Sequence, residues 1–158
     1  MEGYKLGDNL PGIDQVLTKD GQKTLAEVVE GYKFYAIYFS AHWCPPCRNF
    51  TPVLSQFYEE VNKDGAKNLQ IVFLTSDKDD AAFQGYYETM PWVAVPFDFE
   101  GKQAVKQQHG VQGIPMLPIF NSQGVKIVEN GRQVVHQAQG EGKQSDLIAT
   151  WSAWIHLT

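Results

Sequence analysis

The sequence predicts an α/β fold in which a central mixed β-sheet is flanked by helices on both faces and preceded by an N-terminal β-hairpin. Two apolar runs without Gly or Pro, Phe34–Phe39 and Leu69–Thr75, enclose a segment whose apolar residues recur at helical spacing. A strand, a helix and a strand in this order predict a parallel unit with buried strands. Two short strand-like segments separated by Asn121–Gly124 predict an antiparallel addition, which makes the sheet mixed.

Length and composition restrict the kind of protein that this fold can be. The chain has 158 residues, of which 43% are hydrophobic, so we expect one domain, residues 1–158, acting as a monomer. The net charge of −5 argues against nucleic acid and membranes as partners. No apolar run approaches the roughly 20 residues that span a bilayer. Because residues 1–15 show no secretory signal, we expect a cytoplasmic protein, with the nucleus as an alternative.

The N-terminal part of the chain carries the signals of a hairpin and of a capped helix. An Asp-Gly pair predicts a tight turn between strands at 15–17 and 22–24. Thr24 and Glu27, three residues apart before an apolar repeat, form the capping-box pattern. The buried strand Phe34–Phe39 follows, so the first helix connects the hairpin to the sheet.

The rest of the chain continues the alternation of helices and strands. An amphipathic helix runs to Val61, with its prolines at the first turn and Pro52 near its start. After the second buried strand, the pattern predicts helices at Ala82–Thr89 and Lys102–His109, strands at Met116–Phe120 and Val125–Val128, and a final helix at Leu147–Ile155.

The residues Trp43-Cys44-Pro45-Pro46-Cys47 lie between the first buried strand and the long helix. A helix N-terminus presents unpaired N–H donors and the positive end of the dipole, which lower the pKa of a thiol there. We therefore expect Cys44 to be the exposed attacking thiolate. Cys47 can then attack a mixed disulfide formed at Cys44, which gives a reversible two-electron cycle. Pro45 and Pro46 suit the first helical positions, and Trp43 forms an apolar wall.

Three other interpretations of the cysteine pair compete with this one. The pair is half of a zinc site completed by two of the histidines, it is a structural disulfide, or it is a pair of buried inert thiols. The single, dispersed histidines argue against zinc, so we predict no metal. A reducing compartment argues against a structural disulfide, and the turn position argues against inert burial. The histidines are His42, His109, His136 and His156.

At these residues the sequence resembles the thioredoxin superfamily, and more closely its tryparedoxin and nucleoredoxin branch. The resemblance rests on Tyr38–Arg48 as a block, on Met90-Pro91-Trp92 with Val95-Pro96-Phe97, and on Gly110–Pro115. Together these segments span most of the chain in the same order as in the branch. The resemblance implies a thioredoxin-like fold and a thiol-disulfide oxidoreductase.

The resemblance also implies roles for single residues. Pro115 matches the proline that is cis beside the active-site disulfide, and Ile114 matches the position whose backbone pairs with an extended substrate. Arg132 lies where family members carry an arginine able to meet acidic substrate groups. Pro52 matches a proline that kinks the helix. Arg48, which follows the pair, is a candidate for tuning the thiolate; for both arginines the alternative is a solvated surface side chain.

Three positions depart from the family pattern. Thioredoxins carry a buried acid six residues before the first cysteine, where this chain has Tyr38, so water or Asp77 must be considered for proton transfer with Cys47. Ser76 stands where tryparedoxins commonly place a tryptophan, which puts their dithiol specificity in doubt. Pro118 interrupts the strand expected after the cis-proline, so that strand is expected to be irregular.

The sequence as a whole predicts a protein-disulfide reductase with no bound cofactor. No Gly-x-Gly-x-x-Gly stretch follows a strand, so electrons should arrive from a low-molecular dithiol or a flavoprotein reductase and pass to disulfide-containing proteins, peroxidase-type or other. The alternatives are a disulfide isomerase or oxidase, and a redox-sensitive protein-interaction module.

Overall fold

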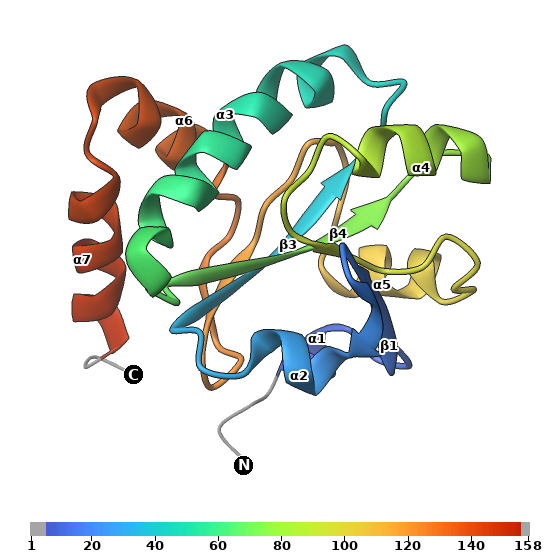
Figure 1. Cartoon of the computed structure of the whole chain (residues 1–158), viewed down its shortest axis with the longest axis horizontal. Coiled ribbons are helices and arrows are strands. Elements are labelled where there is room, and N and C mark those ends of the chain that lie inside the picture. The colour runs from blue at the N-terminus through green and yellow to red at the C-terminus, as the bar shows by residue number, and fades with distance from the viewer. Residues whose placement is uncertain (1–5, 156–158) are drawn as a thin grey trace.

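A computed structural model describes residues 6–155, which form one seven-stranded mixed sheet with helices on both of its faces (Figure 1). The strands are β1 (Gln15–Thr18), β2 (Gly21–Thr24), β3 (Phe34–Ser40), β4 (Leu69–Thr75), β5 (Val93–Ala94), β6 (Ile119–Asn121) and β7 (Lys126–Val128). The helices are α1 (Leu6–Asn9), α2 (Leu25–Val29), α3 (Pro45–Val61), α4 (Asp80–Tyr87), α5 (Lys102–Gln108), α6 (Arg132–Glu141) and α7 (Gln144–Ile155), with a 3₁₀ turn at Lys63–Gly65. None of the helices in this range combines the length and the apolar character that a membrane crossing requires.

The sheet has the strand order β2-β1-β5-β4-β3-β6-β7. β3 pairs in parallel with β4, and β4 pairs in parallel with β5, as a strand-helix-strand unit requires. β6 and β7 add to the other side of β3 as an antiparallel pair, and β1 and β2 form the N-terminal hairpin. The predicted mixed sheet with an N-terminal hairpin is therefore confirmed.

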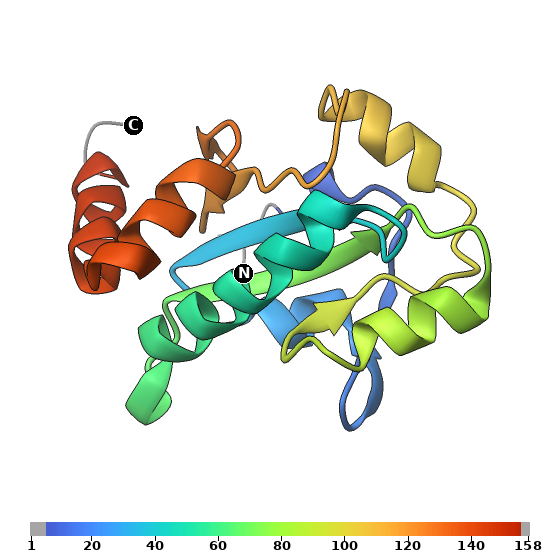
Figure 2. The same ribbon diagram turned by 90° about the horizontal axis from the view of Figure 1, so that it is seen from above.

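The two faces of the sheet carry separate apolar cores because successive residues of β3 point to opposite sides. Phe34 and Tyr38 face α3, α4, α6 and α7, whereas Ile37 and Phe39 face α2 and α5. All seven residues of β3 are buried. Viewed from above, α6 and α7 lie together at one end of the molecule and α4 at the other, with α3 between them (Figure 2). The central strand therefore fixes both layers of helices.

Local sequence signals predicted several element boundaries correctly. Thr24 caps α2, with its hydroxyl accepting the Glu27 N–H and the Glu27 carboxylate accepting the Thr24 N–H. Pro45 and Pro46 occupy the first two positions of α3, and the helix continues through Pro52. These signals act within a few residues of the chain, so their outcome depends little on the rest of the fold.

Other elements were missed or misplaced. The strand expected at Met116–Phe120 begins only at Ile119, because Pro118 has no N–H to donate to a ladder. Met116 makes a single bridge to Phe39 instead. The short elements β5 and α1 and the ten-residue helix α6 were not predicted; α6 has few apolar residues, and packing of Val135 and Ala138 against the core stabilises it.

Trp151 of α7 offers a test of this packing, because its fully buried ring makes edge contacts with Phe34 and Phe57. We expect Trp151→Ala to lower the free energy of unfolding by about 3–5 kcal/mol through lost burial and a cavity. Trp154→Ala on the same helix is the control, since the Trp154 side chain is 38% exposed and surface changes cost about 0.5 kcal/mol or less. Urea unfolding measures both; equal losses would contradict the packing.

Candidate active site

The cysteine pair lies where the buried strand β3 ends and α3 begins. Cys44 is the N-cap residue of α3, and its Sγ accepts the backbone N–H of Cys47 at 3.3 Å. Pro45 and Pro46 have no N–H, so the Cys47 N–H is the first backbone donor of the helix. This hydrogen bond and the helix dipole both favour negative charge on the Cys44 sulfur.

The two thiols are free and differ in their surroundings. Cys44 is 5% exposed, so the expectation of an exposed attacking thiol was wrong, and Cys47 is fully buried. Ala41 and the side chain of Ile114 pack against the pair, because the loop before Pro115 folds over it. The Cys44 thiol lies 3.7 Å from the Ile114 carbonyl oxygen, to which it donates. Any molecule that reacts with Cys44 must therefore approach its sulfur along a narrow path.

The walls of this path come from the loops on either side of the sulfur. The Ile114–Pro115 peptide bond is cis, and the residue after it pairs with Phe39 of β3. On the other side, the Trp43 ring is 55% exposed, and its Nε1–H donates to the Ser76 carbonyl oxygen at 3.1 Å. The indole therefore offers a fixed apolar surface to solvent beside Cys44.

Asp77 and Arg48 hold the loop that precedes Cys44. The Asp77 carboxylate is 7% exposed and accepts the His42 N–H at 2.8 Å and the Thr75 hydroxyl at 2.7 Å. The Arg48 guanidinium donates to the His42 carbonyl oxygen at 2.6 Å. Both side chains thus fix the backbone of His42, and their expected roles toward the sulfurs stay predictions.

The environment of Cys47 disfavours its thiolate. Burial, and after it the neighbouring Cys44, raise the pKa of the Cys47 thiol to about 11, against the lowering effects of the Ser40 hydroxyl and the Ala41 backbone. A thiol with such a pKa stays protonated near neutral pH. The two cysteines therefore differ in their surroundings: Cys44 caps the helix, and Cys47 lies fully buried.

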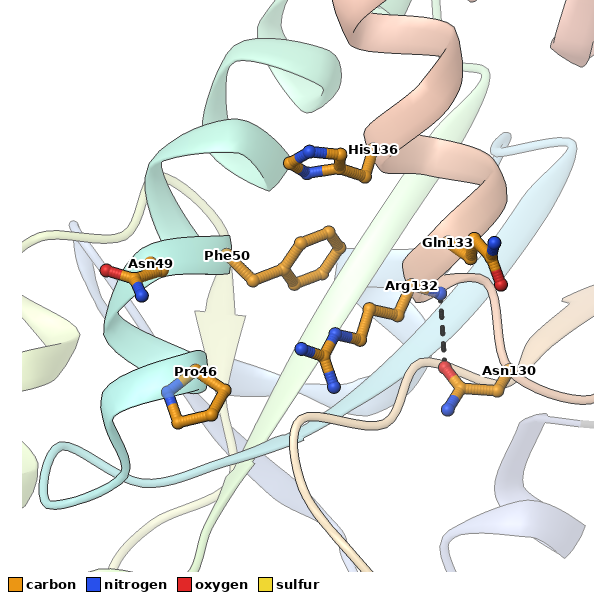
Figure 3. A pocket seen from close by; sticks show the side chains of 7 residues that line it. All are labelled: Pro46, Asn49, Phe50, Asn130, Arg132, Gln133 and His136. Atoms are coloured by element: carbon orange, nitrogen blue, oxygen red, sulfur yellow. Dashed lines mark hydrogen bonds between the residues drawn. The ribbon is translucent and has the colours of Figure 1, made fainter.

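A groove of about 720 Å³ opens beside the pair, between α3 and the start of α6 (Figure 3). The guanidinium of Arg132 extends into it toward Pro46, while the Arg132 N–H donates to the Asn130 side chain at 3.1 Å. His136 and Phe50 line its far part. The structure thus brings Arg132 to the active site from a segment 88 residues away in the chain, counted from Cys44.

Three polar residues behind the pair were not predicted as site residues from the sequence. Ser40, Thr51 and Tyr86 are buried and joined by hydrogen bonds next to Cys47. A hydroxyl residue four positions after Cys47 on a helix was the one local signal available.

The histidines proposed as zinc ligands are dispersed in the fold. His42 stacks on Tyr86, and the buried His109 contacts the Asn9 carbonyl oxygen on the opposite side of the sheet from α3. His136 lines the groove, and His156 lies outside the described residues. Between residues 6 and 155, the His, Cys, Asp and Glu side chains form no group of three or more that could hold a metal ion.

The difference between the two thiols predicts the order of alkylation. We expect iodoacetamide to label Cys44 before Cys47 in the reduced protein at pH 7, because Cys47 is fully buried and the pKa of its thiol is raised to about 11. Peptide mapping by mass spectrometry after short exposures measures the order. The Cys44→Ser variant, in which Cys47 should label slowly, is the control. Faster labelling of Cys47 would contradict the assignment.

Comparison with known protein sequences identifies relatives of this chain. A family model described as Thioredoxin-like matches residues 31–125. Tryparedoxin of Trypanosoma brucei brucei is 40% identical over 124 residues, which cover 78% of this chain and 83% of that protein. Probable nucleoredoxin 1 of Arabidopsis thaliana is 40% identical over 123 residues, which cover 78% of this chain but 21% of that protein. The chain thus spans about a fifth of the length of this nucleoredoxin.

Solved structures agree with these matches. Tryparedoxin I from Crithidia fasciculata superimposes with a TM-score of 0.76 at 36% identity, covering 85% of this chain and 92% of that one. Tryparedoxin II complexed with glutathionylspermidine gives a TM-score of 0.76 at 30% identity, covering 90% of this chain and 96% of that one. With the cysteine pair at the start of α3 and the cis-proline loop beside it, the chain belongs to the thioredoxin-like family and is related to tryparedoxins and nucleoredoxins.

Proposed function

We propose that the chain is a protein-disulfide reductase in which Cys44 attacks and Cys47 resolves. One observation carries the proposal: the Cys44 sulfur caps α3 and accepts the Cys47 N–H, while Cys47 lies fully buried behind it. Membership of the thioredoxin-like family supports the same chemistry. The geometry gives one thiol the hydrogen bond that stabilises a thiolate and keeps the other as an internal nucleophile.

The reaction consists of two thiol-disulfide exchanges. The Cys44 thiolate attacks one sulfur of a substrate disulfide, the substrate S–S bond breaks, and the first substrate thiolate leaves and takes up a proton. Cys47 then loses its proton and attacks the Cys44 sulfur, which forms the Cys44–Cys47 disulfide and releases the second substrate thiolate. The substrate gains two electrons and two protons, and the protein dithiol is oxidised.

An external thiol must reduce the protein again. We assign this role to a low-molecular dithiol or a flavoprotein reductase acting on the Cys44–Cys47 disulfide, with no cofactor bound to the chain. The relative solved with glutathionylspermidine supports a small thiol as one partner. Disulfide-containing proteins, peroxidase-type or other, are the proposed electron acceptors. The groove at Arg132 offers a cationic contact for a carboxylate next to the reacting sulfur.

Reductase turnover tests the proposal. We expect the wild-type protein to catalyse reduction of insulin disulfides by a small dithiol, and Cys44→Ser to abolish this activity because no attacking thiolate remains. Cys47→Ser should trap a mixed disulfide on Cys44, since the resolving thiol is missing. Turbidity of precipitating insulin measures turnover, and intact-mass spectrometry detects the adduct. Val134→Ala, an exposed change on α6, is the control variant.

Two other results would contradict a reductase. Stoichiometric binding of a partner that persists in Cys44→Ser, without turnover in the wild type, would indicate a redox-sensitive interaction module. A reduction potential near about −180 mV, the value of protein disulfide isomerase, would indicate an isomerase or oxidase, whereas we expect a value nearer about −270 mV. Titration in glutathione buffers with counting of free thiols measures the potential.

The position of the Arg132 guanidinium in the groove predicts a preference for acidic substrates. We expect Arg132→Ala to raise KM for glutathione disulfide about 3- to 10-fold with kcat nearly unchanged, because the groove loses a charge that binds substrate and transition state alike. Arg132→Lys should lose part of this binding. Lys143→Ala removes a positive charge outside the groove and serves as the control. An equal KM in Arg132→Ala and wild type would exclude the contact.

A further inference from the structure

Four hydroxyl groups form a continuous buried chain behind the resolving cysteine. The Ser40 Oγ lies 2.7 Å from the Tyr86 hydroxyl, which lies 2.7 Å from the Thr51 Oγ1, which lies 2.7 Å from the Tyr38 hydroxyl. None of the four side chains is more than 3% exposed. They come from β3, α3 and α4, so only the folded protein assembles them.

Two members of this hydrogen-bond chain, Thr51 and Ser40, act on Cys47. The Thr51 hydroxyl also donates to the Cys47 carbonyl oxygen at 3.0 Å. The Ser40 hydroxyl favours the charged form of Cys47 and lowers the pKa of its thiol. The titratable groups packed around Cys47 are Cys44, which precedes it at the start of α3, and Tyr86 of α4. The exposed His42 ring stacks on Tyr86 and covers it on the solvent side.

The hydroxyl protons can be placed along this hydrogen-bond chain in two complete arrangements. With Cys47 as a thiol, its S–H donates to Ser40, Ser40 donates to Tyr86, Tyr86 and Tyr38 donate to Thr51, and Thr51 donates to the Cys47 carbonyl oxygen. With Cys47 as a thiolate, Ser40 donates to sulfur, Tyr86 donates to Ser40, Thr51 donates to Tyr86, and Tyr38 still donates to Thr51. Each hydroxyl has one proton and two lone pairs, so both arrangements are allowed.

The difference between the two arrangements is small. Three hydroxyl protons rotate, no heavy atom moves, and only the side-chain bond to the Cys47 carbonyl oxygen is given up. The Ala41 backbone also favours the Cys47 thiolate. A buried thiolate gains from each further donor, because a hydrogen bond to a charged group is about twice as strong as a neutral one. Reversal of the chain therefore supplies a donor to Cys47 when its proton leaves.

We propose that Ser40, Tyr86 and Thr51 form a reversible hydrogen-bond chain, with Tyr38 as its inner end, that stabilises the Cys47 thiolate in the resolving step. In this proposal Ser40 acts on the reacting sulfur as a catalytic residue, and Tyr86 and Thr51 are positioning residues. The chain accepts no net proton: the proton that leaves Cys47 ends on the departing substrate thiolate. This proposal rests on the proposed reductase function and adds the groups that activate its second nucleophile.

Single-turnover kinetics separate the resolving step from the first attack. An aromatic disulfide whose thiolate absorbs visible light releases one thiolate when Cys44 attacks and a second when Cys47 resolves. We expect Ser40→Ala and Tyr86→Phe to slow the second release about 3- to 30-fold at pH 7, the loss of one hydrogen bond to a charged group, and to leave the first release unchanged. Because removing a donor raises the pKa of Cys47, the second rate should reach its plateau at higher pH.

The control variants distinguish the chain from general damage to the core. Tyr87→Phe removes the next buried phenol of α4, which donates to the Leu17 and Trp92 carbonyl oxygens, and should leave the second release unchanged. Thr51→Val removes the hydroxyl at nearly constant volume and should slow the second release, whereas Thr51→Ser keeps the hydroxyl and should restore it.

A second readout does not depend on turnover. In a Cys44→Ser background, the ¹³Cβ shift of Cys47 followed against pH gives the pKa of its thiol, which Ser40→Ala should raise and Tyr87→Phe should not. The proposed hydrogen-bond chain would be contradicted if Ser40→Ala, Tyr86→Phe and Thr51→Val all left the Cys47 pKa and the resolving rate unchanged. A shift of the Cys47 pKa in Asp77→Asn alone would contradict it as well. If the wild-type protein releases no first thiolate, the reductase function is refuted. The titration of Cys47 then still tests the hydrogen-bond chain, because it does not depend on turnover.

Discussion

The start of helix α3 against the end of the buried strand β3 is the constraint on which the rest of this structure depends. β3 is buried on both faces, so its end is fixed in space, and a four-residue loop leads from it into α3. Pro45 and Pro46 fit the first turn of α3 and leave the Cys47 N–H as the first donor of the helix. The Cys44 sulfur accepts it. One local geometry therefore positions the attacking sulfur and stabilises its charge.

The same junction gives the two cysteines opposite properties. Cys44 meets the helix N-terminus, while Cys47, one turn later, points into the interior, where burial raises the pKa of its thiol. Polar groups buried at that depth must satisfy one another, because water cannot reach them. Tyr38, Thr51 and Tyr86 do so through hydrogen bonds between their hydroxyl groups. The site thus combines a sulfur at a helix N-terminus with a buried second thiol.

The substrate side of the site is assembled from distant segments. Asp77 at the end of β4 fixes the loop before Cys44, and the cis Ile114–Pro115 bond closes the other side. Arg132 reaches the groove only because α6 packs its buried residues against the core beside α3. A chain with a net charge of −5 thereby presents a positive group next to its reactive sulfur.

The sequence by itself determined the mixed sheet, the buried strands, the capping box, the cysteine pair and its place at a helix start, because periodicity and capping act within a few residues. Tertiary structure alone decided the burial of Cys44, the late start of β6 after Pro118, the helix α6 and the hydroxyl chain from Ser40 to Tyr38. These features depend on contacts between segments far apart in the chain, and no local pattern specifies which partners the fold brings together.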